Sequence, residues 1–160
     1  MTGLEYQKAY TRRRSLALLA AILADNFDAA VMLTFRYSGA QIAPAVAVSQ
    51  IRALRAQARR IAGGSFRYVQ TATYDRTEGK AKPVFRLIVQ LPADVCDALT
   101  ASWFMGPADA EAMTPPKLAA FVSDLMEQPP DAWPEHCATW TCSADLRRTA
   151  FASNAPLSLR

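Results

Sequence analysis

Histidine and cysteine are scarce in this chain of 160 residues, and no apolar run approaches the ~20 residues that span a bilayer. A single histidine excludes every metal site and every mechanism that requires two. Three cysteines cannot all pair, so a disulfide framework is not expected and a reducing compartment fits better. His136, Cys137 and Cys142 are spaced as H-C-x4-C, which matches no usual zinc motif. We therefore expect a cytoplasmic protein with no membrane partner, no metal and no cofactor.

Acidic residues are scarce in the first half of the chain. Residues 1–80 contain 12 Lys and Arg but only 5 Asp and Glu, whereas residues 81–160 contain 6 basic and 9 acidic residues. Ten of the 12 basic residues in the first half are Arg, whose planar guanidinium can donate two hydrogen bonds to one phosphate. The first half therefore favours an anionic partner such as a nucleic acid.

Hydrophobic periodicity divides the chain into helices and strands. The predicted helices are Glu5–Phe27, Pro44–Ile61, Asp94–Trp103 and residues 115–126. The predicted strands are Ala30–Tyr37, Ser65–Thr73, Val84–Leu91 and, near the end, Cys137–Cys142. A polar turn around Gly79 separates the second and third strands, so these two are expected to form an antiparallel hairpin.

This order of elements predicts an α+β fold with a single domain, residues 1–160. We expect an antiparallel sheet of the ferredoxin-like, split β-α-β type, with the first two helices and the others packed on one face. The other face would be open, which is a common platform for nucleic acid. Residues 107–160 would form a helical and proline-rich C-terminal part of this domain.

The segment Pro44–Ile61 has two distinct faces. Apolar side chains recur at spacings of 3 and 4 residues and mark the face expected to be buried: Ala47, Ile51, Leu54, Ala58 and Ile61. Arg52, Arg55 and Arg59 fall on another face at the same spacings. This helix is therefore predicted to bury one side and to present arginines to a partner on the other.

Several segments in order carry a family resemblance. VMLTF (residues 31–35) resembles the first strand motif of the rolling-circle replication initiators, and a basic helix, SQIRALRAQARRI, follows it. FRYVQT, a polar turn and VFRLIVQLP come next, and the last of these is similar to the strand that carries the histidine–hydrophobic–histidine motif in that family. WFMG (residues 103–106) is similar to the end of the helix that follows. Over residues 30–106 the chain thus resembles the replication proteins of filamentous phages and related mobile elements.

The catalytic residues of that family are missing. In its active members two histidines hold a divalent metal, and a tyrosine on a later helix attacks the scissile phosphate. The matching positions here are Phe85 or Val84, and Leu87, none of which can ligate a metal. The last tyrosine is Tyr74, which precedes that strand. The resemblance therefore implies a pseudoenzyme with no catalytic residue, while an enzyme of another type stays an open alternative.

The main prediction is a protein of a mobile element. It would bind nucleic acid, DNA in preference to RNA, without cutting it. Arginines would contact phosphates, and a sheet aromatic such as Tyr68 would stack on an unpaired base. The candidate contacts are Arg12, Arg13, Arg14, Arg36, Arg52, Arg55, Arg59, Arg60, Arg67, Tyr68 and Arg86.

The alternative prediction is a small phage or mobile-element inhibitor. Such a protein would bind and block a host nucleic-acid-processing or defence complex, as an anti-CRISPR protein does. A run of carboxylates suits this role because it can imitate a phosphate backbone or meet a basic protein surface. The candidate partner residues are Asp109, Glu111, Asp124, Glu127, Asp131 and Glu135.

Overall fold

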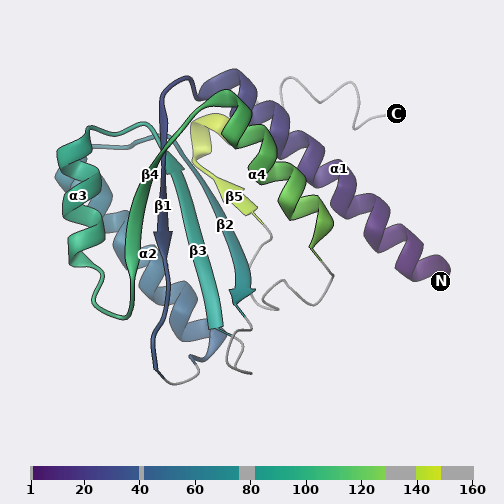
Figure 1. Ribbon diagram of the computed structural model, residues 1–160, viewed down its shortest axis with the longest axis horizontal. Coiled ribbons are helices and arrows are strands. Elements are labelled where there is room, and N and C mark those ends of the chain that lie inside the picture. Colours follow the sequence, from purple (N-terminus) through teal and green to yellow (C-terminus); the bar gives the residue numbers. More distant parts are fainter. Residues whose placement is uncertain (1, 40–41, 76–81, 129–139, 149–160) are drawn as a thin grey trace.

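A computed structural model describes residues 2–39, 42–75, 82–128 and 140–148 of the chain. Its helices are α1 (Gly3–Asn26), α2 (Pro44–Ala62), α3 (Ala93–Ser102) and α4 (Pro115–Glu127), and residues 144–148 add one helical turn. Its strands are β1 (Ala30–Phe35), β2 (Tyr68–Asp75), β3 (Lys82–Val89), β4 (Ala108–Met113) and β5 (Trp140–Cys142). The strands form one antiparallel sheet in the order β4-β1-β3-β2-β5 (Figure 1).

Two split β-α-β units form the centre of the sheet. In the first unit, α2 connects β1 to β2, and β3 lies between these two strands. In the second, α3 connects β3 to β4, and β1 lies between them. The predicted α+β class, the antiparallel sheet and the hairpin of β2 and β3 are thus confirmed.

Helices cover both faces of the sheet, so the prediction that all of them pack on one face is wrong. One core cluster joins α2 and α3 to Phe85 and Leu87 of β3, and the other joins α1 and α4 to Ile88 of the same strand. Because successive strand residues point to opposite faces, these clusters lie on opposite sides of the sheet. Strand β3 has buried apolar side chains on both sides, so both faces of the sheet must be covered at this strand. The expected open sheet face is therefore partly covered by α1 and α4 (Figure 1).

The sequence pattern did not predict β4. Its residues, ADAEAM, include no β-branched or aromatic side chain, and β4 forms because the whole segment pairs with β1 at one edge of the sheet. Asp109 and Glu111 are exposed there, as is common on edge strands that avoid further pairing. At the other edge, β5 consists of Trp140–Cys142. The rest of the predicted last strand lies outside the described residues.

Local signals fix the ends of α2. Pro44 occupies the first turn, where a missing backbone N–H costs nothing. At the other end Gly63 adopts a left-handed conformation with φ of 80°, and the amides of Gly63 and Gly64 bond to the carbonyls of Arg60 and Arg59. None of the helices in the described ranges is long and apolar enough to cross a membrane.

The loop after α3 is fastened to the end of β1. The indole nitrogen of Trp103 donates to the carbonyl of Arg36 at 2.7 Å. The amide of Arg36 donates to the Pro107 carbonyl, and the Ser38 amide to the Met105 carbonyl, at 2.9 and 3.0 Å. Gly106 lies so close that a Cβ there would be 2.5 Å from the Arg36 carbonyl oxygen and 2.7 Å from the Ser38 nitrogen. Only glycine fits this contact between two backbones.

Replacing Gly106 by Ala is expected to destabilise the protein by about 1–3 kcal/mol, because neither backbone segment can move without losing its hydrogen bonds. Denaturant unfolding measures this change. Gly64→Ala is the matched control, since a Cβ at that position has no neighbour within 4 Å. Equal stability of the two variants would contradict the close backbone contact.

Candidate nucleic-acid interface

Helix α2 carries arginines outside its buried apolar face. Ala47, Ile51, Leu54 and Ala58 are buried, as the periodicity predicts, whereas Ile61 is 41% exposed and not part of that core. Arg52, Arg59 and Arg60 are exposed, and Arg55 is half-buried. The two-faced helix is confirmed, apart from its last apolar residue.

Arg55 is held in place by residues of β2. Its guanidinium lies 5.1 Å from the centre of the Tyr68 ring, and its Nη1 donates to Oε1 of Gln70 at 3.0 Å. Burial lowers the pKa of Arg55. Tyr68 acts to raise this pKa, and the positive charges of neighbouring arginines lower it further. An arginine stays protonated under these conditions, so the site holds a fixed, partly desolvated cation.

A fourth arginine comes from the far end of the chain. The charges that act on Arg55 include Arg52 and Arg59 of α2 and also Arg147 of the turn 144–148. The fold brings Arg147 there because β5 pairs with β2. We call Arg52, Arg55, Arg59 and Arg147 the arginine surface. Within the part of the chain that the structure describes, none of these four forms an ion pair with a carboxylate.

The candidate contacts on the sheet are engaged by other residues. Arg36 lies 3.6 Å from Asp75, and Arg67 lies 2.8 Å from Asp145. Partial burial alone would raise the pKa of Asp145, but hydrogen bonds from Ser143 and Arg67 hold it below its usual value. Each of these two arginines is thus matched by an acid.

Arg86 and Tyr68 are not freely accessible. Arg86 is half-buried and donates to the Thr73 hydroxyl at 3.2 Å; burial and the nearby Arg36 lower the pKa of Arg86. The Tyr68 side chain is only 9% exposed, between Phe66 and Arg55. The structure therefore leaves little of the Tyr68 ring accessible to a base, and the ring lies against the guanidinium of Arg55.

Arg12, Arg13 and Arg14 form a separate basic group. They belong to α1, which packs on the face opposite α2, and the N-terminal half of α1 extends beyond the sheet (Figure 1). Arg13 and Arg14 are exposed, and the Arg14 guanidinium lies 5.8 Å from the centre of the Tyr10 ring. The candidate arginines thus divide between two helix layers and do not make one surface.

The acidic candidates lie away from the arginine surface. Asp109 and Glu111 are on β4, at the edge of the sheet opposite β5, and Glu111 pairs with Lys117 at 3.2 Å. Asp124 and Glu127 are exposed on α4. Asp131 and Glu135 lie outside the described residues.

The positions that match the family's two histidines lie in the core. Phe85 and Leu87 are fully buried against α2 and α3, and Val84 is buried on the other face. Cys96 and Cys142 belong to the clusters on opposite faces, so they cannot share one metal ion. Burial raises the pKa of both thiols, which keeps them protonated. In the described ranges no three His, Cys, Asp or Glu side chains come together as a metal site.

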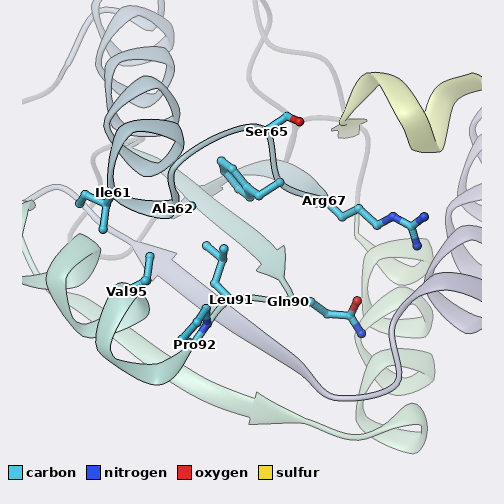
Figure 2. Close-up of a pocket in the computed structure, with 9 residues that line it drawn as sticks. Ile61, Ala62, Ser65, Arg67, Gln90, Leu91, Pro92 and Val95 are labelled. Atoms are coloured by element: carbon cyan, nitrogen blue, oxygen red, sulfur yellow. The ribbon is translucent and has the colours of Figure 1, made fainter.

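A pocket of about 330 Å³ opens beside the C-terminal end of α2. We call it the Phe66 pocket. Figure 2 shows apolar side chains that converge on it and polar ends that point away from it. The lining residues are Ile61, Ala62, Ser65, Phe66, Arg67, Gln90, Leu91, Pro92 and Val95. Phe66 links this pocket to the arginine surface. The centre of its ring lies 5.4 Å from that of Tyr68, and the guanidinium of Arg55 lies over the Tyr68 ring.

Comparison with known proteins finds no relative: no family model, no curated protein and no solved structure matches this chain. The arginine surface must therefore be interpreted from its own geometry and charge.

Proposed function

We propose that this protein binds nucleic acid, DNA in preference to RNA, through the arginine surface and does not cut it. The observation that carries the proposal is the set of four arginines that have no carboxylate partner among the described residues, one of them fixed by Tyr68 and Gln70. Guanidinium groups arranged in this way suit the phosphates of a nucleic-acid backbone. A fixed cation loses little conformational entropy on binding. Arg55 therefore contributes to affinity through this low entropic cost as well as through its charge.

The proposal includes an origin as a catalytically inactive relative of the rolling-circle initiators of mobile elements, in the cytoplasm. The split β-α-β sheet is compatible with it but does not by itself indicate a function. The burial of Phe85 and Leu87 supports inactivity, because no side chain at those positions reaches a substrate.

The proposal is tested by binding of the purified protein to a short labelled DNA over a series of salt concentrations. We expect binding at low salt, and a logarithm of the affinity that falls linearly with the logarithm of the salt concentration. RNA of the same sequence is expected to bind more weakly. A protein that binds no DNA at low salt would exclude this function.

We expect no nicking of DNA. Single-stranded and supercoiled DNA should stay intact after incubation with the protein and Mg²⁺ or Mn²⁺, since neither the histidine pair nor a tyrosine after Tyr74 is present. Gel electrophoresis measures the cleavage. A covalent adduct of protein and DNA, or cleavage that follows the protein through purification, is the contradicting result.

A second candidate function is inhibition of a host nucleic-acid-processing or defence complex. It is favoured by Phe104, which is 88% exposed on the loop fastened to β1, near the acidic edge strand β4. Large aromatic side chains are enriched among the residues that dominate protein interfaces. This function predicts a host partner that binds stoichiometrically after nuclease treatment and is lost in Phe104→Ala. A partner that disappears with nuclease treatment favours DNA binding instead.

A further inference from the structure

We propose that the Phe66 pocket receives one unpaired base of a single-stranded DNA whose phosphates lie on the arginine surface. This inference rests on the proposed function and adds to it the form of the DNA and the place where a base is held.

The lining of the pocket suits a flat, mostly apolar group. Ile61 of α2, Phe66 of the segment between α2 and β2, and Val95 of α3 line it together with Leu91 and Pro92. Phe66 is only partly buried, so its ring is available on the side of the pocket. Unpaired bases stack on aromatic side chains, whichever base is present.

The pocket and the arginine surface lie next to each other. The rings of Phe66 and Tyr68 are in contact, and Tyr68 in turn supports Arg55. Ile61 and Ala62 of the pocket directly follow Arg59 and Arg60 in α2. A strand with its phosphates on α2 therefore passes the mouth of the pocket.

Polar groups at the mouth provide little basis for choosing between bases. Gln90 and Arg67 point away from the apolar side chains in Figure 2, and Arg67 is paired with Asp145. Binding is therefore expected to tolerate any base. A duplex cannot use the pocket, because its bases are paired and stacked inside the helix.

The test fills the pocket with Ala62→Phe. Ala62 is exposed at the end of α2, so the larger side chain does not disturb the core. Ala119→Phe, at an exposed position of α4, is the matched control. Binding is measured for three ligands of equal length: oligo-dT, a chain of abasic deoxyribose phosphates, and a DNA duplex.

We expect Ala62→Phe to weaken binding of oligo-dT by about 10-fold, which is the range found for loss of one stacked base. The same variant should bind the abasic chain and the duplex as the wild type does, with an unchanged salt slope, because no phosphate contact is lost. Ala119→Phe should match the wild type on all three ligands.

Two results overturn the inference. If Ala62→Phe binds oligo-dT as tightly as the wild type, or loses affinity equally for all three ligands, the pocket holds no base, although DNA binding by the arginine surface stands. If the wild type binds none of the three ligands at low salt, the proposed function fails, and the inference fails with it.

Discussion

Replacing Arg52, Arg55 and Arg59 together by Gln is expected to lower the affinity for a short DNA by about 100-fold at low salt. At about 1 kcal/mol for each charge-assisted contact with a phosphate, the loss of three contacts removes about 3 kcal/mol of binding free energy. The slope of log affinity against log salt should also fall in magnitude, by about 0.9 per lost contact for a duplex or about 0.7 for a single strand. Titrations of the wild type and the variant across a salt series measure both quantities.

The chain offers a control with the same change in charge. Arg12, Arg13 and Arg14 replaced together by Gln remove three positive charges from α1, in the other helix layer. This variant should keep most of the affinity, because only long-range attraction is reduced. If both variants lose affinity equally, net charge and not the arginine surface binds the DNA. If the α2 variant binds like the wild type, the interface lies elsewhere.

Leu54→Ala is expected to cost about 2–5 kcal/mol of stability, because it leaves a cavity where α2 packs on the sheet. Leu54 is 6% exposed and belongs to the cluster that joins α2, α3 and the sheet. For a chain of this size the midpoint of thermal unfolding should fall by roughly 5–15 °C. Calorimetry or circular dichroism measures the shift.

Val46→Ala is the matched control for Leu54→Ala. Val46 belongs to the same helix but is 50% exposed, so its truncation removes little buried surface. Its thermal midpoint should lie close to that of the wild type. A midpoint of Leu54→Ala that equals that of the control would contradict the packing of α2.

The elements with strong apolar patterns could be predicted from the sequence, and their arrangement only in part. The stripe on α2 and the run VFRLIV of β3 identified a helix and a central strand. The same run has apolar residues at successive positions, which indicates that both faces of the sheet are covered at this strand. The predicted open face is inconsistent with this pattern. Strand β4 has no such pattern, because its conformation is imposed by pairing with β1.

The arginine surface was partly visible in the sequence. Spacing placed Arg52, Arg55 and Arg59 on one face of α2, because helical geometry alone decides that relation. Arg147 joins them through the pairing of β5 with β2, a long-range contact that no local pattern contains. The ion pairs that occupy Arg36 and Arg67 depend on the same kind of contact.

The separation of the two core clusters affects how the chain folds during its synthesis. The face under α2 and α3 uses only elements that end at residue 113. Helix α1 is made first, yet it packs on α4, Cys142 and Leu146. At about 5–20 residues per second, α4 follows α1 by roughly 5–20 s. During that interval the apolar side chains of α1 are open to chaperones and to other nascent chains, and the layer that carries most of the arginine surface can close before the interval ends.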